Sequence, residues 1–271
     1  MKDYALELAS KKTDYNSKVN TMREYLQAYI LRIMHDKGVF RSTSFLGGTA
    51  LRFLHGLPRF SEDLDFSSVQ KGAVDFSGLM KKIKDELILA GYDVNVTYNE
   101  KKTVQSAFVK FAGLLFEAGV SPLKSQKFSI KIEIDTDPPE GALLETSVVN
   151  IYFPVSFLTY DLPSLFAGKL HALLSREYVK GRDYFDLGWY LSRWKDIRPN
   201  ILLLTNALKQ TKWTGKMPSE DNWRNLIFEV VDQADWKKIR EDVDSFLENP
   251  KDLEIFSKEN VLSLLGHEGK K

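Results

Sequence analysis

Two aspartates separated by a single residue, Asp63 and Asp65, follow closely after a glycine turn in the stretch FLGGTALRFLHGLPRFSEDLDFS. On a strand, both carboxylates project from one face, while Leu64 and Phe66 point the other way into the core. Neighbouring carboxylates repel each other unless a cation neutralises them, and Mg²⁺ is a common solution where phosphates are nearby. The pair therefore predicts a magnesium site.

The glycine turn consists of Gly47, Gly48 and Thr49, and we predict that a helix begins at Thr49. Glycines allow backbone N–H groups to approach a phosphate closely, and a helix presents the positive end of its dipole at its N-terminus. These three residues predict a binding site for the phosphates of a nucleoside triphosphate (NTP) beside the metal.

A third acid is expected on a neighbouring strand, because two metal ions about 3.5–4 Å apart need further oxygen ligands. The stretch KFSIKIEID places Glu133 and Asp135 on one strand face and isoleucines on the other. We favour Glu133, which is more central in the strand, and keep Asp135 as the alternative. A lone DxD pair is most often an exposed strand face, but the turn, the pair and the acidic strand in this order indicate phosphoryl or nucleotidyl transfer.

A second group of charged residues lies in KLHALLSREYVKGRDYFDL, residues 169–187. On a helix, Lys169 and Arg176 are about two turns apart and share one stripe. Asp183 and Asp186 share a face of the next helix, where they either form ion pairs with Arg176 or Arg182 or act in catalysis. Both interpretations stay open from the residues alone.

The elements that must position these residues follow from hydrophobic periodicity and turn residues. The pattern predicts a mixed α/β half followed by a helical half, with the boundary near residues 155–162. In the first half we predict helices at 17–37 and 76–91 and strands before Gly47 and at 59–68, 92–99, 107–116 and 127–135, with 148–161 extended. In the second half we predict helices at 162–179 and 182–194 and weaker helices beyond.

Composition excludes several classes of protein. Among 271 residues, 38 Lys and Arg balance 37 Asp and Glu, so the chain lacks the overall charge of a nucleic-acid binder, although a local basic patch is compatible with this balance. There is no cysteine, which excludes disulfides and thiolate metal sites, and the four histidines lack zinc-ligand spacing. No signal peptide or apolar run of about 18 residues is visible, so we expect a cytoplasmic protein without a membrane partner.

The two motifs together resemble the AbiEii/AbiGii toxin nucleotidyltransferases of type IV toxin–antitoxin and abortive-infection systems, which include the MenT toxins. GGTALRFLHGLPRFSEDLDF carries the first motif and KLHALLSREYVKGRDYFDL the second, and the resemblance covers about residues 40–195. The family is a branch of the DNA polymerase β-like superfamily. The resemblance implies an α+β fold, in which a mixed-sheet nucleotidyltransferase domain at 1–158 is followed by a helical C-terminal domain at 159–271 that completes the active-site cleft.

The same resemblance implies roles for individual residues. Asp63 and Asp65 would bind Mg²⁺, with Glu133 as the third ligand, although the family more often has Asp there. The triphosphate would be held by Gly47, Gly48 and Thr49. Lys169 and Arg176 would contact nucleotide phosphate, and Asp183 would be a functional acid.

The function that this implies is Mg²⁺-dependent transfer of NMP from an NTP to an RNA, with the tRNA 3′ end as the leading acceptor, so that translation stops. The expected partner is a cognate antitoxin protein encoded nearby. Transfer to a small molecule or a protein hydroxyl stays open, as does a non-catalytic protein that binds nucleotide or a partner. An RNA acceptor predicts a basic surface in the cleft formed by Lys169, Arg176, Lys180 and Arg182.

Overall fold

The structure is a computed structural model and describes residues 1–69 and 74–266. The chain forms two compact units. The first consists of Met1–Gly56, Phe60–Pro138 and Glu145–Thr159. The second consists of Leu57–Arg59, Pro139–Leu144 and the chain from Tyr160 onward.

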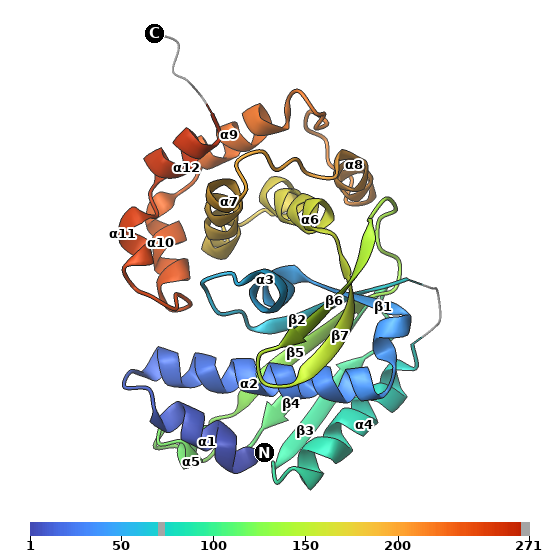
Figure 1. Ribbon diagram of the computed structural model, residues 1–271, viewed down its shortest axis with the longest axis vertical. Coiled ribbons are helices and arrows are strands. Elements are labelled where there is room, and N and C mark those ends of the chain that lie inside the picture. The colour runs from blue at the N-terminus through green and yellow to red at the C-terminus, as the bar shows by residue number, and fades with distance from the viewer. Residues whose placement is uncertain (70–73, 267–271) are drawn as a thin grey trace. The chain divides into compact units, whose positions relative to one another are not determined.

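The first unit is built on a seven-stranded mixed sheet with the strand order β3-β4-β5-β2-β1-β7-β6 (Figure 1). The central strand β2 pairs antiparallel with β1 and parallel with β5. This arrangement confirms the predicted α+β mixed sheet. The strands are β1 (Thr43–Leu46), β2 (Asp63–Ser68), β3 (Val94–Asn99), β4 (Val104–Phe111), β5 (Phe128–Asp135), β6 (Leu144–Asn150) and β7 (Pro154–Tyr160).

One face of this sheet is covered by the apolar faces of amphipathic helices. Met22 and Ile30 of the long helix α2 and Ile83 of α4 belong to the same buried cluster as Leu64 of β2 and Ile132 of β5. The polar residues that alternate with these strand residues consequently lie on the opposite face. The helices of this unit are α1 (Lys2–Ser10), α2 (Tyr15–Asp36), the 3₁₀ turn η1 (Val39–Arg41), α3 (Gly47–His55), α4 (Phe76–Leu89) and α5 (Leu114–Glu117).

Several predicted boundaries were wrong. The strand predicted at 59–68 begins at Asp63, and the helix predicted at 162–179 ends at Ser175. Helix α3 begins at Gly47 and not at Thr49. The strand predicted to extend to residue 116 ends at Phe111, because Gly113 takes a left-handed conformation (φ 69°) and starts the short helix α5. The extended stretch predicted at 148–161 is two strands, β6 and β7, separated by a bend.

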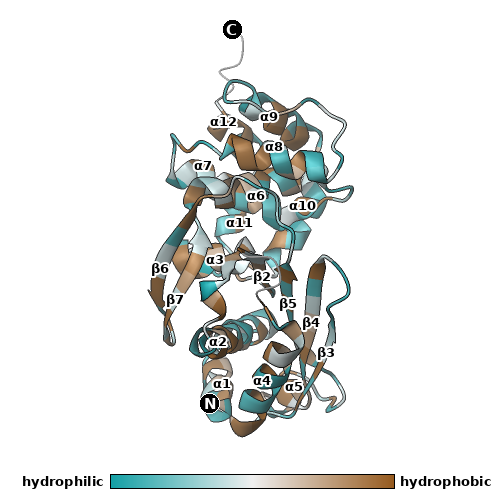
Figure 2. Ribbon diagram, turned by 90° about the vertical axis from the view of Figure 1, so that its right-hand side faces the viewer, coloured by the Kyte–Doolittle hydropathy of each residue, from teal (hydrophilic) through white to brown (hydrophobic). Residues whose placement is uncertain are grey.

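The second unit is helical. It contains α6 (Leu162–Ser175), α7 (Gly181–Arg193), α8 (Ile201–Gln210), α9 (Trp223–Gln233), α10 (Trp236–Asp244), α11 (Asp252–Ile255) and α12 (Lys258–Leu264). Asp161 caps α6 by accepting a hydrogen bond from the Ser164 N–H. Hydrophobic and hydrophilic residues share each of the longer ribbons, as amphipathic packing requires (Figure 2). Aromatic rings fill the interior, where Phe166 lies 4.6 Å from Tyr190 and 5.6 Å from Trp223 between ring centroids.

Candidate active site

The paired aspartates lie side by side on the face of β2 that points away from the apolar core. Asp63 and Asp65 are partly exposed, whereas Leu64 and Phe66 are buried, as the alternation predicted. The parallel register with β5 sets Lys131 opposite Asp63 and Glu133 opposite Asp65. Three carboxylates and one ammonium therefore project from adjacent strands onto the same face.

The register also separates the two candidates for the third acid. Asp135 lies opposite Ser67, one step beyond the aspartate pair. Its carboxylate accepts a hydrogen bond from the Asp137 N–H at 3.0 Å, and burial raises the pKa of the Asp135 carboxyl. Asp135 thus stabilises the turn that follows β5, while Glu133 is the acid beside Asp65.

The glycine turn brings the chain against the Asp65 side chain. Gly47 has φ 80°, a conformation that side-chain-bearing residues rarely adopt. A Cβ at this position would collide with Oδ2 of Asp65 and would lie 3.0 Å from the Asp65 Cβ. The turn and the acid pair are therefore neighbours in space, and glycine at position 47 is what permits this closeness.

Thr49, which we predicted to help hold the triphosphate, makes a contact within the protein. Its side chain is fully buried (0% exposed), and its hydroxyl donates a hydrogen bond to the carbonyl oxygen of Asp63. In this structure the hydroxyl links α3 to β2. The groups that remain for an anion at this helix end are backbone N–H groups, since no side chain among the described residues caps the start of α3.

Gly47→Ala is expected to lower transfer activity at least about tenfold, because the new Cβ must push the Asp65 carboxylate aside, and a displacement of about 1 Å at a reacting centre can reduce rate about 100-fold. Steady-state transfer rates and thermal melting would be measured. Gly56→Ala is the matched control, because Gly56 has φ 70° but no atom within 4 Å of its added Cβ. If both variants lose stability and activity equally, the contact with Asp65 has no functional consequence.

Lys131 supplies the positive charge on the acidic face. Its Nζ lies 2.8 Å from Oε1 of Glu133. Burial alone would lower the pKa of the Lys131 ammonium, but the carboxylates of Glu133, Asp63 and Asp65 reverse the effect, so its pKa is raised. Across the residues that the structure describes, no three acidic, histidine or cysteine side chains are already gathered tightly enough to hold a metal ion.

The second predicted motif forms a buried ion-pair network in the helical unit. Lys169 of α6 places its Nζ 2.6 Å from Asp186 and 3.1 Å from Asp183, both on α7. Arg176 completes the predicted group, with its Nε 3.4 Å from the second oxygen of Asp183. Arg182, which we considered as a partner, pairs with Asp242 at 3.8 Å. The structure therefore brings Lys169, Arg176 and Asp183 together as a brace, and direct phosphate contact by Lys169 stays a prediction.

Arg59 is a member of this network that the sequence did not indicate. Its Nε and one terminal nitrogen each donate to an oxygen of Asp186 at 2.6 Å, and both side chains are almost completely buried. Because 127 residues separate the two partners, no spacing rule could connect them. The role of Lys131, in contrast, was visible as the i, i+2 neighbour of Glu133 on the same strand face.

Electrostatics keep the network ionised. Burial alone would raise the pKa of the Asp183 carboxyl, but the charges of Lys169, Arg176 and Lys180 outweigh it and hold this pKa below its usual range. Burial alone would likewise lower the pKa of Lys169, but Asp186 and Asp183 raise it above its usual range. The charges of Lys169 and Asp183 therefore stabilise each other.

A mixed sheet that carries paired aspartates beside a glycine turn and the start of a helix defines a nucleotidyltransferase. The family model described as nucleotidyl transferase AbiEii toxin, type IV TA system, matches residues 30–258. The chain belongs to this AbiEii family.

One solved structure has the same fold. The crystal structure of a candidate nucleotidyltransferase from H. pylori is 21% identical, covers 91% of each chain and superposes with a TM-score of 0.55. JHP933 from Helicobacter pylori is also 21% identical, over 90% of this chain and 87% of that one, with a TM-score of 0.49.

No curated protein matches the chain. Among the described residues, no helix is both long enough and apolar enough to cross a membrane.

Proposed function

We propose that this protein transfers NMP from an NTP to an RNA hydroxyl, with Mg²⁺ as the cofactor and the tRNA 3′ end as the leading acceptor. The observation that carries the proposal is the register of β2 and β5, which sets Asp63, Asp65 and Glu133 on one face beside the Gly47 turn. As a member of a type IV toxin–antitoxin family, the protein would act by blocking translation. The partner encoded nearby would be its antitoxin.

The acidic face fits a hard divalent cation. All three candidate ligands are carboxylates, which Mg²⁺ prefers, and they project from adjacent strands. When bound, the metal neutralises negative charge on the phosphates and makes an acceptor hydroxyl more acidic. Lys131 Nζ and Glu133 Oε1 are paired at 2.8 Å. Glu133 can therefore serve as a metal ligand once the Lys131 ammonium moves away from this oxygen.

The turn before α3 would hold the triphosphate. The first N–H groups of a helix lack acceptors within the helix and attract anions. Gly47 and Gly48 carry no side chain that would keep a phosphate away from these groups. The hydroxyl of Thr49 fixes the turn to β2 through the Asp63 carbonyl, so the phosphate site and the acid pair keep a constant separation.

The reaction exchanges one bond to phosphorus for another. The acceptor oxygen bonds to the α-phosphorus, the bond from that phosphorus to the bridging oxygen breaks, and pyrophosphate leaves while the hydroxyl proton passes to solvent. The residues of the chain contribute by orienting the triphosphate and by holding carboxylates where positive charge is needed. In the second unit, Lys169 and Asp183 keep Arg176 in position.

Incubating the purified protein with Mg²⁺, each of the four α-³²P-labelled NTPs and total RNA tests the proposal. Label in an RNA band, and in the tRNA fraction in particular, is the expected result. Label in protein or in a small molecule would show that the same chemistry has another acceptor. Absence of label with every NTP would indicate that the protein binds nucleotide or a partner without catalysing transfer.

Lys131→Gln is expected to bind Mn²⁺, a spectroscopic substitute for Mg²⁺, about 2- to 5-fold more tightly than the native protein, since a partly exposed competing cation is worth roughly 0.5–1 kcal/mol. Electron paramagnetic resonance of free Mn²⁺ measures this without turnover. Lys127→Gln, an exposed position just before β5, is the charge-matched control. Equal affinity of the Lys131 variant and the native protein would show that Lys131 does not compete with the metal.

A further inference from the structure

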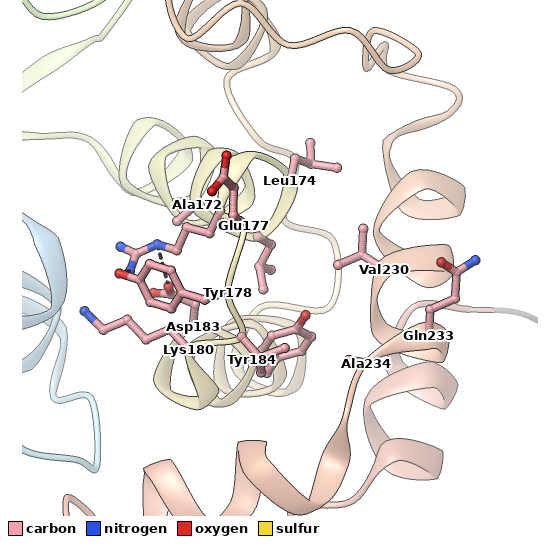
Figure 3. A pocket seen from close by; sticks show the side chains of 13 residues that line it. Ala172, Leu174, Glu177, Tyr178, Lys180, Asp183, Tyr184, Val230, Gln233 and Ala234 are labelled. Atoms are coloured by element: carbon pink, nitrogen blue, oxygen red, sulfur yellow. Dashed lines mark hydrogen bonds and ion pairs between the residues drawn. The ribbon is translucent and has the colours of Figure 1, made fainter.

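A pocket of about 280 Å³ lies within the helical unit, between the loop that follows α6 and helix α9 (Figure 3). Arg176, Tyr178 and Lys180 line it from the loop, and Val230 and Gln233 line it from α9. Its volume lies just below the roughly 300–1,000 Å³ that is typical of sites for small molecules. The space therefore suits a single ring system with one attached group.

In this loop the aromatic residue Tyr178 stands between Arg176 and Lys180 in the sequence. Tyr178 is 66% exposed, which is unusual for a large ring that lines a pocket. Nη1 of Arg176 donates to the Tyr178 hydroxyl at 3.1 Å, and the guanidinium carbon lies 5.7 Å from the ring centroid. Figure 3 shows Tyr178 and Lys180 on the same side of the loop. The ring is therefore held in place while much of its surface stays open to a ligand.

The lining of the pocket carries two cations, Arg176 and Lys180, and two carboxylates, those of Glu177 and Asp183. The Asp183 carboxylate is already paired with Lys169 and Arg176. Figure 3 shows the Glu177 carboxylate turned away from Lys180 and Tyr178. Burial and the nearby charge of Arg182 lower the pKa of the Lys180 ammonium. A bound anion would stabilise the charged form of this lysine.

We propose that this pocket binds one nucleotide of the single-stranded acceptor RNA, with its base stacked on Tyr178 and its phosphate held by Lys180 and Arg176. An aromatic platform flanked by cations is the combination by which proteins hold single-stranded nucleic acid. The donor triphosphate has its own proposed site at the Gly47 turn. The proposal therefore assigns Arg176, which the family resemblance placed on nucleotide phosphate, to a phosphate of the acceptor. The inference rests on the proposed function and specifies where the acceptor strand is held.

Fluorescence anisotropy of a 5′-fluorescein-labelled RNA heptamer of mixed sequence tests this with the full chain and without NTP. Tyr178→Ala is expected to raise the Kd about 5- to 100-fold, because stacking of one base on an aromatic ring is lost. Tyr178→Phe keeps the ring and is expected to stay within about threefold of the native Kd. Equal affinities of the alanine variant and the native protein would overturn the proposal.

Salt dependence tests the phosphate contact separately. Lys180→Gln is expected to reduce the slope of log K against log salt by about 0.7, the value for one single-strand phosphate contact. Lys216→Gln, at an exposed position of the same unit, should leave the slope unchanged. An unchanged slope for Lys180→Gln would remove this lysine from the RNA site.

Two further results distinguish this inference from the proposed function. If the native protein transfers NMP to RNA but Tyr178→Ala weakens only NTP binding, the pocket belongs to the donor, and the inference is wrong while the function stands. If the heptamer binds as expected and no label is ever transferred to RNA, the function is wrong and the RNA site stands.

Discussion

Asp65→Asn should lose at least about 99% of nucleotidyl transfer, because a carboxylate ligand that supplies several kcal/mol of charge stabilisation is worth 100-fold or more in rate. Asparagine has nearly the same shape, so it still fits against Gly47, where the native side chain leaves no room for a Cβ. The loss should therefore come from the missing charge and not from misfolding. Initial rates of label transfer at saturating NTP measure it.

Two controls make this result specific. Asp85→Asn changes an exposed carboxylate on α4 and should keep native activity. Mn²⁺ binding of the Asp65 variant should weaken together with its rate, since the same oxygen serves both. An Asp65 variant that transfers label within about threefold of the native rate would show that the metal site has been assigned to the wrong residues.

The second large effect concerns stability. Asp186→Ala is expected to lower the free energy of unfolding of the helical unit by about 3–5 kcal/mol, because it leaves the buried charges of Arg59 and Lys169 without their shared partner. Asp186 is completely buried and accepts 2.6 Å contacts from both cations. A loss of this size is a large fraction of the roughly 5–15 kcal/mol that stabilises a typical domain.

Tryptophan fluorescence during urea unfolding measures this effect in the correct unit, since all five tryptophans, at positions 189, 194, 213, 223 and 236, lie in the helical unit. Asp232→Ala is the control, because its carboxylate is half exposed and pairs with Lys258 at the surface. That variant should lose at most about 1 kcal/mol. If the Asp186 and Asp232 variants unfold at the same urea concentration, the network does not brace the unit.

The local features of the candidate site could be predicted from the sequence. Alternation along 59–68 and 127–135 predicted which side chains share a face, and the structure confirms it for residues 63–66 and for β5. The two motifs indicated the family, which the match over residues 30–258 confirms. These predictions succeeded because strand periodicity depends on residues that are adjacent in the chain.

Thr49 shows what local reasoning leaves out. A hydroxyl at the start of a helix after two glycines resembles a phosphate ligand, yet it bonds to the carbonyl of Asp63, which is 14 residues away. The packing of α3 against β2 determines the hydrogen-bond partner of this hydroxyl. A pattern of residue spacing does not reveal such a tertiary contact. The exposed loop residue Tyr178 carried no recognisable signal either, because its significance comes from the pocket beside it.

The sequence by itself determined the fold class, the faces on which Asp63, Asp65 and Glu133 lie, and the family. Only the tertiary structure decided that Glu133 and not Asp135 adjoins Asp65, that Lys131 lies opposite Asp63, and that Arg59 meets Asp186. The physical reason is that side-chain direction within one strand or helix follows from local backbone geometry. Partners from separate elements depend instead on register and packing, which form only when distant segments bury their apolar faces together.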